Sequence, residues 1–194
     1  MTSQPETHLI LASQSPRRQQ LLREAGWQFK VDPPDDSVEQ AVDESLPPEQ
    51  FVEAAALAKA TSIGARHETG IVLAADTVAD CDGEILGKPT DRTDAARMLT
   101  AMSNRTHRVL TGVCLWDCKS EKHASYVEQT TLKMDAFPCD QLDAYLDSGQ
   151  WRGKAGAFGY QDGLGWIHIV DGLESNVVGL PVERLSNWLF DLML

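Results

Sequence analysis

Short apolar runs alternate with amphipathic stretches along the chain. Apolar and β-branched runs predict strands at Leu9–Ala12, Trp27–Val31, Ile71–Ala75, His107–Trp116, Ser125–Ala136 and Trp166–Val170. Apolar residues at helical spacing predict helices at Arg17–Ala25, Glu49–Arg66, Thr93–Met102, Cys139–Ser148 and Val182–Phe190. This alternation predicts an α/β fold.

Residues that favour turns separate these elements. Ser15-Pro16 predicts a capped helix start, with proline at the first helical position. Asp82-Gly83 predicts a tight hairpin turn. The acidic, proline-containing stretch Asp32–Pro48 and the glycine-rich stretch Trp151–Gly165 are predicted as loops. The two strands predicted on either side of residue 120 are expected to pair antiparallel.

The composition is that of a globular protein, with 194 residues, 42% of them hydrophobic and 24% charged. No repeat or linker divides the chain, which predicts a single domain over residues 1–194. A net charge of −12 argues against binding a nucleic acid polymer but leaves a small polyphosphate open. No apolar run approaches the roughly 20 residues that span a bilayer. Met1–His8 lacks a signal-peptide pattern, so we expect a cytoplasmic protein without a membrane partner.

The cysteines and histidines form no recognisable site. We expect ordinary buried thiols rather than disulfides at Cys81, Cys114, Cys118 and Cys139. The histidines form no HExxH or similar ligand pair.

The first candidate site is the segment Ser13–Arg18, where a predicted strand leads into a helix. Free backbone N–H groups at a helix N-terminus attract anions. Arg17 and Arg18 oppose the helix dipole there, and a bound phosphate would explain them. A solvated basic helix start is the alternative.

The second candidate is Asp76, where the apolar strand Ile71–Ala75 is expected to end in Asp76-Thr77. Ligands of open α/β sheets bind beyond the carboxyl ends of strands. A carboxylate there can hold Mg²⁺ or orient a water as general base. A structural aspartate in a turn or helix cap is the alternative.

Lys59 and Lys88 are the third candidates. Lys59 lies on an otherwise apolar part of a predicted helix, where a charge is costly unless it is paired or reaches the surface. Lys88 follows the predicted hairpin. A lysine in either setting is more often an ordinary surface residue, and this is the alternative. Pro89 stands where a Walker motif requires a hydroxyl residue, which argues against a P-loop ATPase.

The fourth candidate is the glycine-rich stretch Gly153–Gln161. Its glycines permit close backbone approach to a ligand. Phe158 or Tyr160 could stack on a nucleotide base, and Gln161 could read the base edge. A plain connecting loop is the alternative.

Several motifs resemble, in order along the chain, those of the Maf family of nucleotide pyrophosphatases. They are Ser13–Arg18 (SQSPRR), Ala75–Val78 (ADTV), Gly87–Pro89 (GKP), Ser103 with His107–Val113, Lys154–Gln161 (KAGAFGYQ) and Asn176–Pro181 (NVVGLP). They extend over nearly the whole chain. Each motif alone is a weak signal, but their shared order is highly specific.

The resemblance implies an inosine-triphosphatase-like α/β fold, with an elongated mixed sheet, flanking helices and two lobes around a central cleft. It implies hydrolysis of a nucleoside triphosphate to the monophosphate and pyrophosphate. It also implies a divalent cation, Mg²⁺ or Mn²⁺, and a homodimer.

Residue roles follow from the same resemblance. Asp76 matches the proton-acceptor aspartate of the family. The positions that match its phosphate-side residues are Ser13, Arg18, Lys59 and Lys88. The positions associated with base choice are Arg17, Thr77 and Gln161, and they resemble the branch that acts on dTTP and UTP. The branch acting on 7-methyl-GTP has Trp in place of that arginine and Glu in place of the glutamine.

The sequence departs from the family pattern at three places, of which Ala79, where a second aliphatic residue is common, is expected to have little effect. The second acidic site residue, expected after the second strand, matches Glu39, with Asp36 as the rival, because the loop spacing is shifted. We expect Asp76 and Glu39 to hold the metal. Tyr160 replaces the usual isoleucine before Gln161, which leaves fine base selectivity open.

Two other functions stay open at this stage. One is a nucleotide-binding regulator of cell division with little turnover, since the first named members of the family were linked to septum formation. The other is a pyrophosphatase acting on 7-methyl-GTP or on a broad range of nucleotides.

Overall fold

A seven-stranded mixed sheet forms the backbone of the molecule in a computed structural model that describes residues 8–137, 139–185 and 188. The strands are β1 (Leu9–Leu11), β2 (Phe29–Val31), β3 (Ile71–Cys81), β4 (Glu84–Leu86), β5 (Thr106–Asp117), β6 (Lys122–Met134) and β7 (Ile167–Asp171). Their order is β2-β1-β3-β5-β6-β7, and β4 pairs with β3. The pairs β2–β1 and β1–β3 are parallel, and all others are antiparallel.

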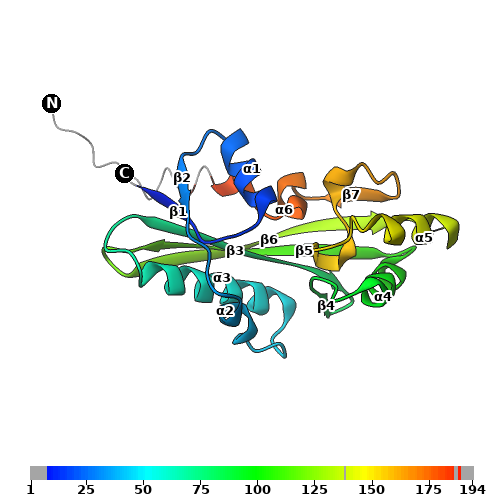
Figure 1. Cartoon of the computed structure of the whole chain (residues 1–194), viewed down its shortest axis with the longest axis horizontal. Helices are drawn as coiled ribbons and strands as arrows, with labels where there is room; N and C mark the ends of the chain where they lie inside the picture. The colour runs from blue at the N-terminus through cyan, green and yellow to red at the C-terminus, as the bar shows by residue number, and fades with distance from the viewer. Residues whose placement is uncertain (1–7, 138, 186–187, 189–194) are drawn as a thin grey trace.

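Helices cover both faces of this sheet (Figure 1). They are α1 (Pro16–Glu24), α2 (Asp36–Gln40), α3 (Pro48–Gly64), α4 (Arg92–Met102), α5 (Cys139–Ser148) and α6 (Glu174–Val178). Helices α1 and α6 lie on one face, whereas α2 and α3 lie on the other. The glycine-rich segment contains two short 3₁₀ turns, η1 (Ala155–Ala157) and η2 (Tyr160–Asp162).

The apolar run in β3 is buried on both faces because its side chains alternate. Leu73 and Ala75 belong to a core cluster on the α1 side of the sheet. Val72 and Ala74 belong to a second cluster with residues of α3. Side chains of consecutive strand residues point to opposite faces, so a strand covered on both sides reads as a continuous apolar run.

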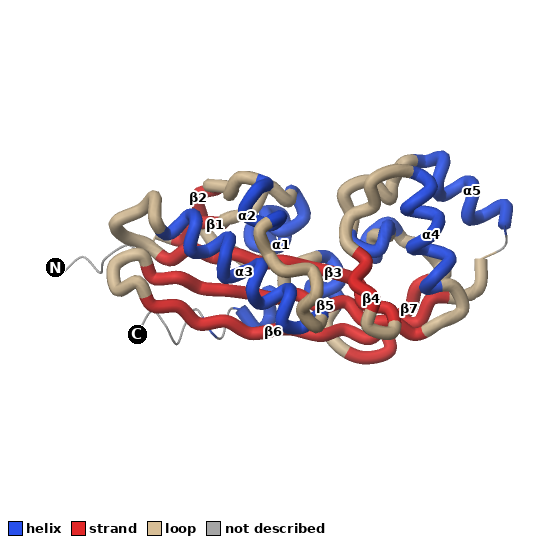
Figure 2. The backbone as a smooth tube through the Cα atoms, turned by 90° about the horizontal axis from the view of Figure 1, so that it is seen from below, coloured by secondary structure: helices blue, strands red, loops and turns tan. Residues whose placement is uncertain are grey.

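A second lobe forms around the other end of the long strands. Its core joins α4, α5 and β7 to the distal parts of β3, β5 and β6, with Leu99, Met102 and Leu132 fully buried. Figure 2 shows α4, α5 and β7 together at one end and α1, α2 and α3 towards the other. The expected architecture, an elongated mixed sheet with flanking helices and two lobes, is confirmed.

Gly112 lets α3 pack unusually close to β5. A Cβ atom at Gly112 would lie 2.2 Å from the carbonyl oxygen of Val52 in α3, so no larger residue fits without moving the helix. Lys59 lies about two helical turns after Val52, on the same face of α3. The close contact therefore brings Lys59 against the sheet.

One expectation about β3 is wrong. The strand does not end at Asp76-Thr77 but continues to Cys81, and Asp76 pairs with Gly112 in the middle of β5. The apolar run only seemed to end because Asp76 interrupts it. Nevertheless, the parallel neighbour β1 stops at Leu11, opposite Leu73, so Asp76 still lies beyond the carboxyl end of a strand.

Short helices account for the other differences. The predicted loop Asp32–Pro48 contains α2, and α6 was not expected. Each has five residues, too few to show a helical repeat. The predicted helix Val182–Phe190 is helical at residues 182–185 and 188, and the rest of it lies outside the described residues.

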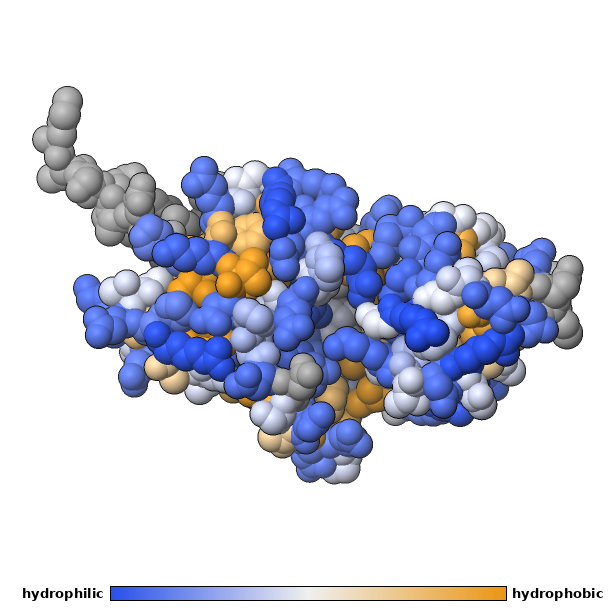
Figure 3. Space-filling view, in the orientation of Figure 1, coloured by the Kyte–Doolittle hydropathy of each residue, from blue (hydrophilic) through white to orange (hydrophobic). Residues whose placement is uncertain are grey.

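Smaller predictions are confirmed. Asp82 (φ 55°) and Gly83 (φ 89°) form a tight turn between β3 and β4. Cys81, Cys114 and Cys118 are buried free thiols, and the side chain of Cys139 lies outside the described part of the structure. No helix among the described residues is long and apolar enough to cross a membrane. The face seen in Figure 3 is mostly hydrophilic, in keeping with the charged composition.

Candidate active site

A pocket of about 470 Å³ lies between the two lobes. Its walls come from the β1–α1 connection, α2, α3, β3, the Lys88 region, the segment 152–161 and the end of α6. Nine predicted site residues line it: Ser13, Arg17, Arg18, Glu39, Lys59, Asp76, Thr77, Lys88 and Gln161. Tyr160, one of the two candidates for stacking on a base, does not line the pocket but packs against the core of the second lobe. The central cleft implied by the resemblance is therefore present, and it gathers side chains that are up to 148 positions apart in the sequence.

An acid–lysine cluster forms one side of the pocket. Asp76 on β3 and Lys59 on α3 are only 5% and 6% exposed. The Nζ atom of Lys59 lies 2.5 Å from Asp76 Oδ1 and 2.9 Å from Glu39 Oε2. Lys59 is thus a buried, paired charge, as its apolar helix context requires, and loss of either partner would leave charge poorly compensated.

Glu39 links this cluster to the pocket mouth. Its second carboxylate oxygen lies 3.9 Å from Nζ of Lys88, whose side chain is 62% exposed. Burial raises the pKa of Glu39, but the charges of Lys59, Lys88 and Arg18 outweigh burial and hold this pKa below its usual value. The structure places Glu39 in the pocket, whereas the side chain of its rival Asp36 lies outside the described residues.

Arg18 on α1 is held by three groups of the protein. Its Nε donates to the carbonyl oxygen of Gly179 (2.8 Å), Nη1 to Ser13 Oγ (3.3 Å) and Nη2 to Thr77 Oγ1 (3.0 Å). A guanidinium carries five N–H groups, so one N–H on each terminal nitrogen stays available beyond these bonds. Burial lowers the pKa of Arg18, opposed by the charges of Asp76 and Glu39.

The turn before α1 presents polar groups to the pocket. Ser15 is the N-cap, and its hydroxyl accepts from the backbone N–H of Arg18 at 3.4 Å. The backbone N–H of Ser15 donates to Ser13 Oγ at 3.2 Å, and Ser13 is 6% exposed. The first turn of α1 holds no acidic residue. The predicted capped start is confirmed, and its polar groups open towards the pocket.

Thr77 supports Arg18 from β3. Besides accepting from Arg18, its hydroxyl lies 2.9 Å from the hydroxyl of Thr111 on β5. Thr111 in turn donates to the carbonyl oxygen of Asn176 at 3.3 Å. Sequence reasoning assigned no role to Thr111 or to the Gly179 carbonyl, although both lie within the family motifs, because hydrogen bonds between distant segments leave no mark on a single sequence.

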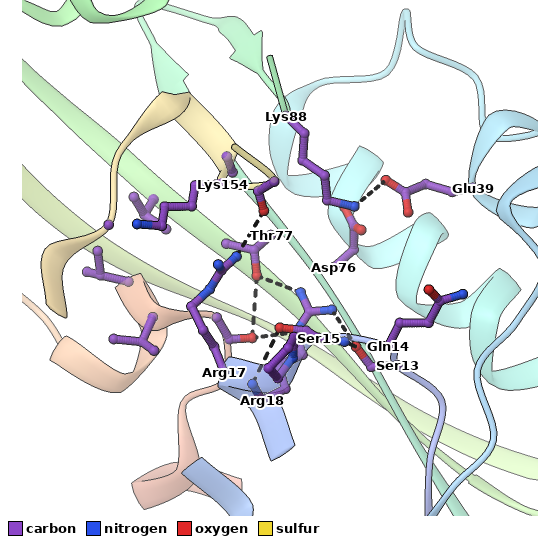
Figure 4. Close-up of a pocket in the computed structure, with 18 of the residues that line it drawn as sticks. Ser13, Gln14, Ser15, Arg17, Arg18, Glu39, Asp76, Thr77, Lys88 and Lys154 are labelled. Carbon is purple, nitrogen blue, oxygen red and sulfur yellow. Dashed lines mark hydrogen bonds and ion pairs between the residues drawn. The ribbon is translucent and has the colours of Figure 1, made fainter. Parts of the chain in front are cut away.

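Arg17 and the glycine-rich segment form the other side of the pocket (Figure 4). Nη2 of Arg17 donates to the carbonyl oxygen of Gly153 at 3.0 Å, and Gln161 is exposed. Phe158 also lines the pocket, but it is only 5% exposed. The segment therefore lines the pocket and is held by a hydrogen bond from Arg17, unlike a plain connecting loop.

The carboxylates of Asp76 and Glu39 are the groups in the pocket that could hold a cation together with a ligand. Both contact the same Lys59 nitrogen, so their oxygens lie closer together than the sum of those two distances. Mg²⁺ is usually bound by one or two carboxylates together with substrate phosphates. The described residues hold no group of three or more His, Cys, Asp or Glu side chains that would bind a metal without such a ligand.

Sequence comparisons with known proteins point to one family. A protein named dTTP/UTP pyrophosphatase from Rhodopirellula baltica is 50% identical over 186 residues, which cover 95% of this chain and 82% of the relative. Another of that name, from Symbiobacterium thermophilum, is 41% identical, with 91% and 89% covered. A HAM1 protein structure from Coxiella burnetii superposes with a TM-score of 0.54 at 17% identity, covering 95% of this chain and 98% of that one, which shows a shared fold. The family model described as Maf-like protein matches residues 8–192, so the chain belongs to the Maf family.

Proposed function

We propose that this chain is a nucleoside triphosphate pyrophosphatase, built as one domain, that hydrolyses dTTP and UTP to the monophosphate and pyrophosphate. One observation carries the proposal: the buried carboxylate of Asp76 shares a single pocket with Arg18, Lys59 and Lys88. The pocket volume of about 470 Å³ lies in the usual range for small-ligand sites. Relatives named dTTP/UTP pyrophosphatase support this choice of substrate.

The phosphate chain would bind between Arg18 and two lysines of the pocket, Lys59 and Lys88. The N–H groups of Arg18 that its protein partners leave free can grip one phosphate with two hydrogen bonds. The side chain of Lys88 is exposed at the pocket mouth, where it could contact the outer phosphates. Lys59 is fixed beside Asp76, where its charge would stabilise charge that develops at the reacting phosphate.

Asp76 would act as the general base. Its carboxylate accepts the proton of a water whose oxygen attacks the α-phosphorus, and the bond from that phosphorus to the bridging oxygen breaks. Pyrophosphate leaves with the bridging oxygen, and the monophosphate keeps the water oxygen. Burial of Asp76 beside Lys59 keeps the carboxylate in one orientation for this step.

Asp76 and Glu39 are the residues that would hold Mg²⁺ or Mn²⁺ with the substrate phosphates. Such a cation would neutralise phosphate charge and so assist departure of pyrophosphate.

Base choice would be made on the other side of the pocket. We propose that Arg17 and Gln161, which line that side, contact the base. The resemblance groups Thr77 with them. Because the hydroxyl of Thr77 contacts Arg18, we propose instead that Thr77 acts on phosphate binding through this arginine and not on the choice of base.

A panel of dTTP, UTP, CTP and 7-methyl-GTP, each with Mg²⁺ or Mn²⁺, tests this function. We expect dTTP and UTP to give equimolar monophosphate and pyrophosphate, in large excess over protein. Diphosphate and orthophosphate as products would exclude attack at the α-phosphorus. Binding without turnover would favour a nucleotide-binding regulator of cell division. Preference for 7-methyl-GTP would favour the family branch that acts on that nucleotide.

The family resemblance also supports a homodimer located in the cytoplasm, which we include in the proposal. Light scattering on the purified chain should give twice the mass of 21.3 kDa. A mass of one chain at micromolar concentration would contradict the dimer, and recovery from the membrane or periplasmic fraction would contradict the location.

A further inference from the structure

A partly buried ion pair closes the glycine-rich segment on itself. Nζ of Lys154 contacts Oδ2 of Asp162, eight residues later, and the two side chains are only 11% and 16% exposed. Most other ion pairs of the described residues join better exposed side chains, such as Arg105 with Asp82. Removal of one partner would leave the other charge partly desolvated and without its counter-ion, so the pair is sensitive to such a change.

The backbone of the segment packs directly against this pair. A Cβ atom at Gly159 would lie 2.8 Å from Lys154 Nζ and 2.7 Å from Asp162 Oδ2, so a larger residue there would displace the ion pair. The backbone N–H of Asp162 donates to the carbonyl oxygen of Gly159 at 3.1 Å. The ion pair and the glycine together fix the path of the chain up to Gln161.

The pair is also connected to Arg17 across the pocket wall. Arg17 donates to the carbonyl oxygen of Gly153, the residue before Lys154, at 3.0 Å. Burial lowers the pKa of Arg17, and the negative charge of Asp162 opposes this effect, so the two groups interact electrostatically. Gln161 is the residue immediately before Asp162, and its exposed side chain lines the pocket.

We propose that the Lys154–Asp162 ion pair is a clamp that positions Arg17 and Gln161 for recognition of the nucleotide base. The inference rests on the proposed function and adds two positioning residues to it. Figure 4 shows Lys154 and Arg17 on the side of the pocket away from Glu39 and Lys88. With its ammonium taken by Asp162, Lys154 acts through the shape of the wall and not as a phosphate ligand.

Binding measurements separate base recognition from phosphate binding. The probes are α,β-methylene-dTTP, which cannot be cleaved at the α–β position, and inorganic tripolyphosphate, which has no base, both with Mg²⁺. We expect Lys154→Met and Asp162→Asn each to weaken binding of the dTTP analogue about tenfold and to change tripolyphosphate binding less than twofold. The double variant should bind the dTTP analogue no more weakly than the more affected of the two single variants, because both changes break the same ion pair.

Arg105→Met is the matched control, because it removes a surface ion pair at the β3–β4 turn, outside the pocket lining. It should leave both affinities unchanged. If Lys154→Met does not fold, as judged by its thermal transition, the nearly isosteric Asp162→Asn carries the test.

Two results would overturn the clamp. An equal loss of affinity for tripolyphosphate would make Lys154 a phosphate ligand, and unchanged affinity for both probes in folded variants would leave the pair without a role in binding. These results are distinct from failure of the proposed function. A wild-type chain that binds the dTTP analogue but releases no pyrophosphate from dTTP would contradict the function alone.

Discussion

Nε of Arg18 donates to the carbonyl oxygen of Gly179 at 2.8 Å, across 161 positions of the chain. The φ angle of Gly179 is 124°, a conformation that favours glycine, and its N–H bonds to carbonyl groups of α6. The backbone after α6 therefore presents a fixed acceptor to the arginine. As a result, the main phosphate-binding candidate is oriented by the far end of the sequence.

Replacing Asp76 by Asn should abolish turnover while sparing substrate binding. The amide cannot accept the proton of the attacking water, although its oxygen can still accept from Lys59. We expect kcat for dTTP to fall by about 10³-fold or more, with binding of α,β-methylene-dTTP changed by only a few-fold. A variant with near-normal kcat would show that another group is the base.

Thr77→Val should weaken binding of the phosphate chain of the substrate. The variant keeps the side-chain shape but removes the hydroxyl that holds Arg18, and loss of one hydrogen bond to a charged group costs about 1.5–3 kcal/mol. We expect affinity for tripolyphosphate to fall roughly tenfold or more, while the dTTP to CTP preference changes little. Thr77→Ser, which keeps the hydroxyl, is the control. A changed base preference with normal tripolyphosphate binding would instead place Thr77 at the base.

Activity should depend on a divalent metal, and replacing Glu39 should raise the metal concentration that activity requires. Chelation with EDTA should abolish activity, and Mg²⁺ or Mn²⁺ should restore it. Because Glu39→Gln removes a charged oxygen ligand, we expect the metal concentration for half-maximal activity to rise about tenfold. Glu44→Gln, an exposed change outside the pocket lining, should have no effect. Identical metal titrations for Glu39→Gln and wild type would remove Glu39 from the metal site.

The buried His107 should make stability depend on pH. Burial lowers its pKa from 6.5 to about 4, with the charge of Asp80 opposing, and neither ring nitrogen has a hydrogen-bond partner among the described residues. Below pH 6.5 the unfolded chain binds a proton at this position that the folded chain refuses, so stability falls as pH decreases towards 4.

Urea unfolding at pH 7 and pH 5 measures this effect. The wild type should lose roughly 2 kcal/mol more over this interval than His107→Leu, which has no group to titrate there. A variant of the exposed His168, such as His168→Gln, should behave like the wild type. Equal pH dependence in His107→Leu and wild type would show that His107 is not the group responsible.

Gly112→Ala should disrupt the contact between α3 and β5. The added Cβ would lie 2.2 Å from the Val52 carbonyl oxygen, which is backbone and cannot rotate away. We expect a loss of roughly 3 kcal/mol in the free energy of unfolding, with activity reduced because Lys59 moves with α3. Gly165→Ala, where a Cβ would meet no atom within 4 Å, is the control. A stable, fully active Gly112→Ala would mean that α3 can shift without cost.

The sequence supports the fold well where elements are long. The apolar run of β3, the helical spacing in α3 and the Asp82-Gly83 turn each follow from local chemistry, and the structure agrees. The motifs also contain most of the predicted residues that line the pocket, whereas Glu39 and Lys59 lie outside them. The elements that were missed, α2 and α6, are too short for a periodic pattern.

The supporting contacts could not be predicted from sequence. Arg18 is held by a backbone carbonyl and by Thr77, and Thr77 is held by Thr111. A carbonyl group is present at every position, so nothing in the sequence distinguishes Gly179 as a partner. The length of β3 was also hidden, because Asp76 is a polar residue whose burial depends on Lys59 from another element.

The continuity of β3 has a consequence for how this pocket can change. Adjacent strand residues face opposite ways, so Asp76 meets Lys59 on the α3 side of the sheet while Thr77 meets Arg18 on the α1 side. Asp76 and Thr77 thus divide one pocket into two halves, with Lys59 beside the carboxylate and Arg18 beside the hydroxyl. Inserting a single residue before Asp76 would turn both side chains to the opposite face of the sheet, so we expect it to disrupt both halves at once.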